Sequence, residues 1–449
     1  MPLKTKSMTL ELIEVSESFY NYEVMTSNGE KFPANRDIKH YRGIVKDTEN
    51  SLVAITFCED EIIGLICTDE GNFNIVKNYQ SGKPLLYNEQ NLKEKKRLTC
   101  GTVDDPTISY ESEVLFRQRS ILSEEASVTQ TRMINKEVRF YVETEYDIYQ
   151  TRGSISSVEA YIAGLFNQVT VLYQNEDILT SVSCIYIWIS NDPYTGTNTS
   201  SLLSQFQSTR TSIIGDLGIL LTFREEVGGG MAAGFSGLCN ASTGQKLSVA
   251  MLDNNDIIGP TYSWSVYVVT HELGHLFGSR HTHACVWNGN DTAIDGCATY
   301  TEATDPNGGY GNCPVPTPMI PLNGGTMMSY CHWWDALNFN LGFGLQPGNV
   351  IRNNVTNANC LYSCNSPIYF TNQTVTQGMI INACGDVDVQ NVTVTNGATL
   401  TIVAGGDINV REVYVINNSS LILEAAGETT IERDFEVELG SEFEIKVNP

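Results

Sequence analysis

Apolar residues alternate with turn-forming residues from about residue 8 to residue 90, in the period-two pattern of short β-strands. The clearest runs are SLVAITF (51–57), EIIGLIC (61–67) and FNIV (73–76). This pattern predicts a small β-rich domain. A polar stretch with little periodicity follows through about residue 132, opened by KEKKR (93–97), and it predicts a linker.

Strand-like and helix-like segments alternate between residues 133 and 365. KEVRFYVETEY, SVSCIYIWIS and GILLTFRE are rich in the β-branched and aromatic residues of strands, whereas SSVEAYIAGLFNQVTVLY and LLSQFQSTRTSI have helical apolar spacing. This succession predicts an α+β or α/β domain with a mixed, largely parallel sheet. After SWSVYVVTHELGHLFG the chain becomes rich in Gly, Pro, Asn and Cys, which predicts loops.

The chain from residue 366 onward is almost wholly β-like and repeats itself imperfectly. TNGATLTI, INNSSLIL and ELGSEFEI begin at residues 395, 416 and 438, and AGGDINV and AAGETTI repeat in step with them. The repeat predicts short stacked hairpins or a small β-solenoid, without a catalytic constellation. We therefore divide the chain into residues 1–132, 133–365 and 366–449, and expect the last to be an appendage that binds a surface or a glycan.

The net charge of the chain limits the classes of binding partner that are expected. The 449 residues carry 27 Lys and Arg against 52 Asp and Glu, a formal net charge of −25, which disfavours nucleic acid and anionic membranes as partners. The positive residues are concentrated at the N-terminal end, where residues 1–132 hold 16 of the 27, in keeping with a border near 132. No run of 18 apolar residues predicts a membrane span.

Twelve cysteines, nine of them after residue 180, are many for a cytosolic enzyme and predict a secreted or cell-surface protein with several disulfides. The N-terminus MPLKTKSMTLELIEVSES lacks the apolar core of a signal peptide, so a signal was removed or the sequence starts after it. Four of the cysteines are expected to staple loops around the candidate site, namely Cys285, Cys297, Cys313 and Cys331.

Histidines at the spacing of a zinc site mark one predicted helix. His271 and His275 are four residues apart, so they project from the same helical face toward one metal ion. Ser263 or Ser265 is expected to cap this helix. Gly278 ends it and permits the sharp turn that brings His281 to the metal as a third ligand.

Three ligands leave one position open, which distinguishes a catalytic zinc from a closed structural site. Glu272 lies beside the first ligand, where its carboxylate can accept a proton from water and later deliver it to a leaving amine. His283 is an alternative third ligand, but the spacing favours His281.

HELGHLFGSRH followed by GGTMMSYCH resembles the metzincin zinc metallopeptidases, in which a methionine turn lies beneath the metal. Met328 matches that methionine; taken alone, a methionine is more often a filler of core gaps. GGGMAAGFSGLCN and the cysteine-rich segment after His281 look most like the bacterial-type members of the reprolysin or adamalysin group. The resemblance implies hydrolysis of proteins or peptides.

Two positions depart from the adamalysin pattern. Thr282 stands where that group commonly has Asp, and Met328-Ser329-Tyr330 resembles the Met-x-Tyr of the astacin and serralysin groups. That second resemblance implies that Tyr330 ligates zinc and stabilises the transition state. The alternative is a tyrosine packed behind the methionine turn.

HYRGIVKDTENSLVAITF, beginning at residue 40, is similar to the propeptide of the reprolysin group, which makes Cys100 a candidate cysteine switch whose thiolate fills the open zinc position. The alternative is a disulfide from Cys100 to Cys58 or Cys67. We favour the switch because Cys58 and Cys67 bracket two hairpin-like strands and could pair with each other.

The leading prediction is a secreted zinc endopeptidase made as a latent zymogen, with Glu272 as general base. Its activation would require cleavage near Arg117, Arg119 or Arg132. A catalytically silent adhesin that binds through the repeats is the alternative. The carboxylates and turn residues at 288–296 and 304–312 are candidate calcium ligands, although such segments are more often plain loops.

Overall fold

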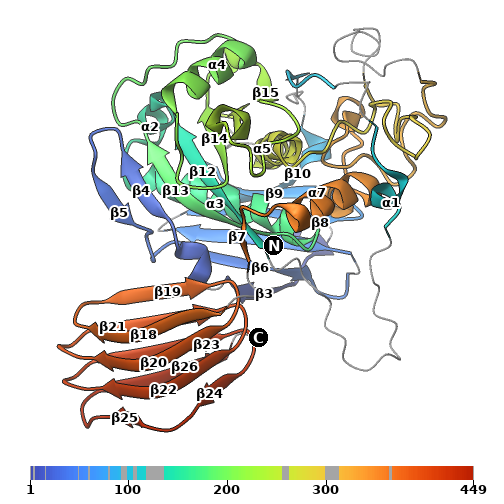
Figure 1. Ribbon diagram of the computed structural model, residues 1–449. Coiled ribbons are helices and arrows are strands. Elements are labelled where there is room, and N and C mark those ends of the chain that lie inside the picture. Colours follow the sequence, from blue (N-terminus) through green and yellow to red (C-terminus); the bar gives the residue numbers. More distant parts are fainter. Residues whose placement is uncertain are drawn as a thin grey trace. The chain divides into compact units, whose positions relative to one another are not determined.

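Figure 1 shows the computed structural model of the chain. It describes residues 2–447 except for 4–5, 16, 49, 59–60, 79–80, 93–98, 105–108, 118–135, 255–261, 299–312 and 364–366. The chain forms two compact units, the first made of residues 1–15, 22–134 and 138–360, and the second of residues 16–21, 135–137 and 361–449. Each unit has its own sheets.

An antiparallel sheet of six strands occupies the N-terminal part of the first unit, in the order β10-β9-β8-β7-β6-β3. Its strands are β3 (Leu10–Glu14), β6 (Lys39–Val45), β7 (Leu52–Cys58), β8 (Glu61–Thr68), β9 (Gly71–Lys77) and β10 (Pro84–Asn88), and a separate pair joins β1 (Pro2–Leu3) to β2 (Lys6–Ser7). Val53, Ile55, Ile66 and Phe73 are buried in one cluster on this sheet. The three strands predicted between residues 51 and 76 are confirmed.

The expected disulfide between Cys58 and Cys67 is wrong. The antiparallel register of β7 and β8 sets Cys58 beside Glu61 at one end of the ladder and Cys67 beside Leu52 at the other end. The two sulfur atoms are therefore kept apart by the length of the strands, and no disulfide joins them.

A mixed sheet forms the centre of the first unit, in the order β11-β15-β16-β14-β12-β13-β4-β5. Its strands are β4 (Glu23–Thr26), β5 (Lys31–Pro33), β11 (Thr99–Cys100), β12 (Lys136–Thr144), β13 (Leu179–Ile187), β14 (Leu217–Thr222), β15 (Gly229–Ala232) and β16 (Leu247–Met251). The pairs β12–β14, β14–β16 and β13–β4 are parallel, whereas β15 is antiparallel to β16. The predicted mixed, largely parallel sheet is confirmed.

The predicted linker contains ordered elements. β11 (Thr99–Cys100) pairs with β15 at one end of the mixed sheet, and α1 (Ser112–Leu115) follows it. The sequence did not predict these elements, because β11 has only two residues and α1 only four, too few to show a periodic pattern.

The longer helices are α2 (Tyr146–Arg152), α3 (Ile155–Gln174), α4 (Thr199–Thr209), α5 (Tyr262–Leu276) and α7 (Leu345–Asn357). The 3₁₀ turns are η1 (Glu17–Tyr20), η2 (Glu89–Asn91), η3 (Glu225–Val227), η4 (Thr243–Lys246), η5 (Cys331–Trp334) and η6 (Phe339–Leu341). None of the helices that the structure describes has the length and apolar character needed to cross a bilayer.

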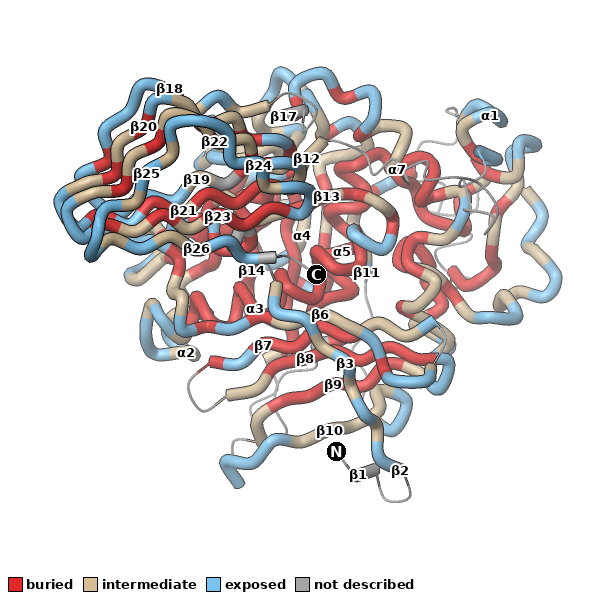
Figure 2. Tube along the Cα trace, turned by 90° about the horizontal axis from the view of Figure 1, so that it is seen from below, coloured by how far each residue is buried: buried red, intermediate tan, exposed pale blue. Residues whose placement is uncertain are grey.

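Helix α3 packs against both sheets of the first unit, and Figure 2 shows it buried along most of its length. Ser154 caps its start by accepting a hydrogen bond from the Ser157 N–H. On the side of the N-terminal sheet, Arg42 Nε donates to Asn167 Oδ1 at 3.0 Å and Asn167 Nδ2 donates to the Ile55 carbonyl at 3.2 Å. The N-terminal sheet thus covers a face of α3 through polar as well as apolar contacts.

Helix α5 begins at Tyr262, so the predicted serine caps are wrong: Ser263 and Ser265 lie inside the first turn. Asn74 on β9 takes the capping role, because its Oδ1 accepts the Ser263 N–H at 2.7 Å. Ser265 Oγ instead accepts the Asp253 N–H at 3.1 Å. A residue far away in the sequence therefore supplies the acceptor that the local pattern assigned to serine.

The second unit contains two parallel sheets built from the C-terminal repeats, with the orders β18-β20-β22-β24 and β19-β21-β23-β26 and with β25 also paired to β22. Its strands are β17 (Tyr362–Ser363), β18 (Ile368–Val375), β19 (Met379–Ala383), β20 (Val387–Val394), β21 (Thr399–Ala404), β22 (Ile408–Val415), β23 (Ser420–Ala425), β24 (Thr429–Ile431), β25 (Phe435–Val437) and β26 (Glu442–Val447). Thr399 pairs with Ser420, and Ser420 with Glu442, so neighbouring strands are one repeat apart and parallel. Stacked hairpins would require antiparallel neighbours.

Candidate metal centre

The three histidines of the motif converge through their Nε2 atoms. His271 and His275 come from consecutive turns of α5, and Gly278, with a φ of 107°, turns the chain so that His281 returns toward them. The Nε2 atom of His275 lies 3.2 Å from that of His271 and 3.2 Å from that of His281. Two nitrogens bound to one tetrahedral zinc at 2.0–2.1 Å would be about 3.3 Å apart, so the spacing fits a metal ion.

Each of these imidazoles has an oxygen partner at its other nitrogen. The Nδ1 atoms of His271 and His275 lie 2.8 Å from the carbonyl oxygens of Met327 and Ser279, and His281 Nδ1 lies 2.6 Å from Asp104 Oδ2. Nδ1–H donation to these oxygens leaves each Nε2 with a lone pair. Three converging lone pairs in a buried site repel one another unless a cation lies between them.

Burial keeps the three rings neutral. It lowers the pKa of His271 to about 4 and places the pKa values of His275 and His281 well below their usual range. The neutral imidazole is the form that binds a metal.

Glu272 lies beside this cluster, fully buried. Its Oε2 is 3.4 Å from the Thr102 hydroxyl and 3.5 Å from Cys100 Sγ, and both groups donate toward it. Burial raises the pKa of Glu272 to about 8, although hydrogen bonds from Cys100, Thr102 and the Ala232 N–H oppose that shift. A Cβ on Gly230 would lie 2.5 Å from Glu272, so the bare glycine backbone leaves the room this carboxylate needs.

Cys100 is brought to the histidines by β11, which runs parallel to β15 so that Cys100 pairs with Gly230. Its Sγ lies 3.4 Å from His275 Nε2, and its ligand atom and those of the three histidines all lie within 4.8 Å of one another. It is not in a disulfide. Burial and the nearby Glu272 raise the pKa of its thiol, whereas a cation at the histidines would favour the thiolate.

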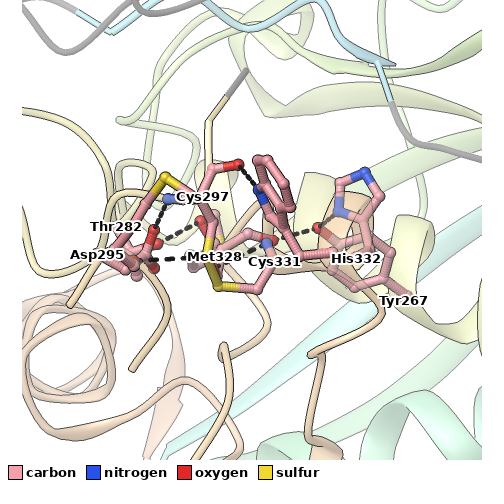
Figure 3. The surroundings of a disulfide bond; sticks show 10 residues. Tyr267, Thr282, Asp295, Cys297, Met328, Cys331 and His332 are labelled. Carbon is pink, nitrogen blue, oxygen red and sulfur yellow. Dashed lines mark hydrogen bonds between the residues drawn. A yellow bond between two sulfur atoms is a disulfide. The ribbon is translucent and has the colours of Figure 1, made fainter. Parts of the chain in front are cut away.

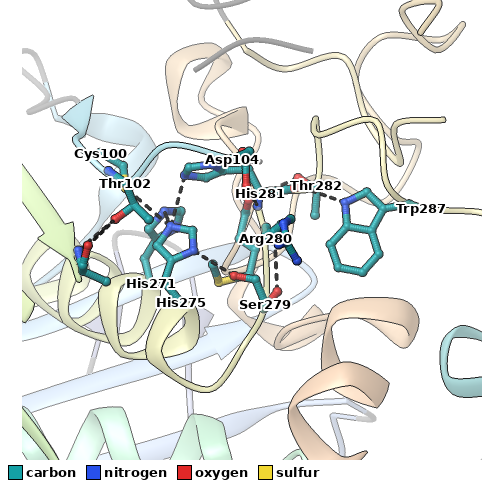
Figure 4. A network of polar contacts seen from close by, with 12 residues as sticks. Cys100, Thr102, Asp104, His271, His275, Ser279, Arg280, His281, Thr282 and Trp287 are labelled. Atoms are coloured by element: carbon teal, nitrogen blue, oxygen red, sulfur yellow. Dashed lines mark hydrogen bonds and ion pairs between the residues drawn. The ribbon is translucent and has the colours of Figure 1, made fainter. Parts of the chain in front are cut away.

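Asp104 and Tyr110 were missed in the sequence, although they belong to the same segment as Cys100. The Tyr110 hydroxyl donates to the Gly278 carbonyl at 2.7 Å, and its ring lies 4.8 Å from that of Trp287. Figure 4 shows Asp104 against His281 and Cys100 near His275. No local signal marks either residue, because both contact groups more than 150 positions later in the chain.

Met328 is fully buried and packs against α5. A Cβ on Gly274 would meet its sulfur at 2.7 Å, so the glycine of the helix makes room for the methionine. The adjacent Met327 supplies the carbonyl that holds His271.

Tyr330 and His283 line the same cluster. The Tyr330 ring lies 4.9 Å from the ring of His281 and 4.7 Å from that of His283. His283 stacks on His281 with ring centres 4.8 Å apart, and it is His281 whose Nε2 meets that of His275. His283 is thus placed behind the third histidine.

Disulfides join the loops around the cluster. Cys285 is bonded to Cys313, Cys297 to Cys331, and Cys239 to Cys360. The expectation that Cys285, Cys297, Cys313 and Cys331 staple these loops is confirmed. Such bonds persist in oxidising compartments and are consistent with an extracellular protein.

Calcium is not supported. In the described part of the chain, every group of three or more side chains of metal-ligand type includes His or Cys, whereas calcium prefers oxygen ligands. From the first candidate segment only Asp295 occurs in such a group, together with two disulfide-bonded cysteines. The second candidate segment, 304–312, lies outside the described residues.

The family of this segment follows from its sequence match. Residues 135–333 match the model Reprolysin_5, metallo-peptidase family M12. This segment is therefore similar to the M12 metallopeptidases. Members of this family use zinc, and the histidine cluster offers the ligands that zinc needs.

Other comparisons add little to the M12 assignment. No curated protein matches the chain. Among solved structures, metalloproteinase-II from Bacteroides fragilis is similar at 12% identity over 63% of this chain and 82% of that chain, with a TM-score of 0.34. A chaperone–substrate complex matches at 12% identity over 48% of this chain and 35% of that chain, with a TM-score of 0.26. Scores this low support no inference about function.

Proposed function

We propose that this chain is a secreted zinc-dependent endopeptidase made in a latent form. The observation that carries the proposal is the convergence of three neutral imidazole Nε2 atoms beside the buried carboxylate of Glu272, within the segment that matches family M12. His271, His275 and His281 would hold one zinc ion. When bound, zinc would polarise the scissile carbonyl and acidify water.

The residues of the chain then have distinct tasks. Glu272 accepts a proton from the attacking water at its carboxylate and passes it to the leaving amine. The carbonyls of Met327 and Ser279 fix the tautomers of His271 and His275, so that both Nε2 atoms stay available. Tyr330, whose ring packs against that of His281, would stabilise negative charge on the reacting carbonyl oxygen.

Latency rests on Cys100. Its sulfur occupies the place beside the histidines and Glu272 where water has to react, and Gly101 N–H donates to the Gly230 carbonyl at 2.8 Å. β11 is thereby hydrogen-bonded to β15, which would be an edge strand without it. The backbone groups of β15 that an extended substrate would need are then already paired. Cleavage after the segment, with Arg117, Arg119 and Arg132 as candidate sites, would be the first step of activation; Arg119 and Arg132 lie outside the described residues.

The adhesin alternative is not favoured, because the family match lies on residues 135–333 and Glu272 is retained beside the histidines. Binding of a surface or a glycan by the repeats stays a separate proposal about the second unit. It is tested by mixing residues 366–449 with glycan arrays, where a lack of binding would remove it.

Removal of metal tests the proposed function directly. Dialysis against a chelator is expected to abolish cleavage of casein by the proteolytically activated chain, and stoichiometric zinc should restore it, because the water of the reaction depends on the metal. Metal analysis of the untreated protein should give one zinc per chain. Chelator-resistant cleavage, or a purified active chain without zinc, would refute the proposal.

Substitution of Gly230 with alanine tests the fit between β15 and Glu272. The new Cβ would fall 2.5 Å from the carboxylate, so Glu272 must move away from the cluster. A displacement of about 1 Å can cost about 10²-fold in rate, and we expect a loss of that size in kcat. Gly244→Ala is the control, since its Cβ would meet only ordinary contacts at 3.6 Å or more. Equal activity of the two variants would contradict this role of Gly230.

A further inference from the structure

The residue after the third histidine is tied to the methionine turn. Thr282 N–H donates to the Met328 carbonyl at 3.0 Å, and the Thr282 hydroxyl lies 3.3 Å from the same oxygen. The position of His281 therefore depends on what holds Thr282. The Thr282 hydroxyl has a second polar partner besides the Met328 carbonyl.

Asp295 is that partner, although it lies 13 positions further along the chain and belongs to no motif. Its side chain is 1% exposed, and Figure 3 shows it beside Thr282. Its carboxylate lies within hydrogen-bond reach of the hydroxyls of Thr282 and Ser329, and the Cys297 N–H donates to its Oδ1 at 3.0 Å. One carboxylate thus receives donors from three separate segments.

The residues that contact Asp295 are neighbours in sequence of the third histidine and of the methionine turn. Thr282 follows His281 directly, and Ser329 follows Met328. Ser329 Oγ also accepts the Cys331 N–H at 3.1 Å, and Cys331 is bonded to Cys297 two residues beyond Asp295. The result is a closed ring of covalent and hydrogen bonds, centred on a buried carboxylate.

Burying a carboxylate away from water costs free energy unless polar groups surround it. Around Asp295 these groups come from Thr282, Ser329 and Cys297. Its apolar replacement would take an acceptor from the Ser329 hydroxyl and the Cys297 N–H, and would remove the polar contact to the Thr282 hydroxyl. We infer that Asp295 is a positioning residue for the metal centre: it holds His281, through Thr282, and the methionine turn, through Ser329, in the arrangement that binds zinc. This inference rests on the proposed function.

The test is the zinc affinity of the full-length chain, measured by competition with a chromogenic chelator. Removal of a partner that orients a metal ligand typically costs about 10- to 100-fold in affinity, and we expect a loss in that range for Asp295→Asn. Thr282→Val, which removes only the hydroxyl and keeps the side-chain shape, should shift affinity in the same direction by less. The absorption spectrum of the cobalt-substituted protein should change in both variants.

Asp147→Asn is the matched control. Asp147 also accepts a backbone N–H, that of Phe223 at 2.7 Å, and a threonine hydroxyl, that of Thr222 at 3.1 Å, and burial raises the pKa of its carboxyl. It should lower thermal stability without changing zinc affinity or the cobalt spectrum. Equal zinc affinity in wild type and Asp295→Asn, or an equal loss in Asp147→Asn, would overturn the inference.

Two further outcomes are informative. If Asp295→Asn does not fold, Thr282→Val decides, and its unchanged zinc affinity and cobalt spectrum would overturn the inference. If wild type itself binds no zinc, the proposed function fails. If wild type binds zinc and the Asp295 and Thr282 variants bind it equally well, only the role of Asp295 fails.

Discussion

Replacing Glu272 with glutamine is expected to lower kcat on a protein substrate by about 10²- to 10⁴-fold, the usual contribution of a general acid–base residue. Glutamine has nearly the same shape, so the histidines should keep their positions, but its amide cannot take up the proton of the attacking water. Zinc content should therefore be unchanged. The measurement is casein cleavage by the activated chain, with metal analysis of the same samples.

The control for Glu272→Gln is Glu159→Gln. Glu159 is also a buried glutamate, and it accepts the Asn35 N–H at 2.7 Å and the Tyr22 hydroxyl at 3.2 Å, away from the histidines. It should retain full activity per folded molecule. Comparable activity in wild type and Glu272→Gln would contradict the assignment of the base, whereas loss of zinc from Glu272→Gln would mean that the carboxylate acts on the metal site instead.

Changing Cys100 to alanine in the full-length chain should raise the basal peptidase activity. The substitution removes the sulfur that lies 3.4 Å from His275 and leaves room for water. If the lost contact is comparable to a hydrogen bond to a charged group, about 1.5–3 kcal/mol, the population of open sites grows by about 10- to 100-fold. The measurement is hydrolysis of a short fluorogenic peptide before any proteolytic treatment.

Activation by Cys100→Ala should remain incomplete, because Asp104 still contacts His281 and Tyr110 still contacts Gly278. Cys184→Ala is the control, since Cys184 is a buried thiol on β13 without a contact to the histidines. Basal activity as low in Cys100→Ala as in the control would remove the inhibitory role of the sulfur and assign latency to the backbone of β11 alone.

The sequence revealed the parts of the site that depend on short-range spacing. His271 and His275 follow from the helical repeat, and His281 from a glycine turn, so the three could be proposed together. The central strands and α3 were likewise predicted, because a long periodic segment carries its own signal.

What the sequence did not reveal depends on contacts between distant residues. Asn74 caps α5 from 189 positions away, and Asp104 meets His281 across 177 positions. The sequence allowed a disulfide between Cys58 and Cys67, but the register of β7 and β8 places them at opposite ends of the ladder. In each case the deciding quantity is a three-dimensional distance, which has no counterpart in residue types or periodicity.

Strand β4 has a consequence for activation. This N-terminal strand is hydrogen-bonded to β13 within the mixed sheet, and the sheet that follows it covers α3. A single cut after Cys100 would therefore give two polypeptides that stay together as a noncovalent heterodimer, with the inhibitory sulfur still in place. Release of activity would then follow an association equilibrium, so the nicked protein should become more active on dilution and less active when concentrated.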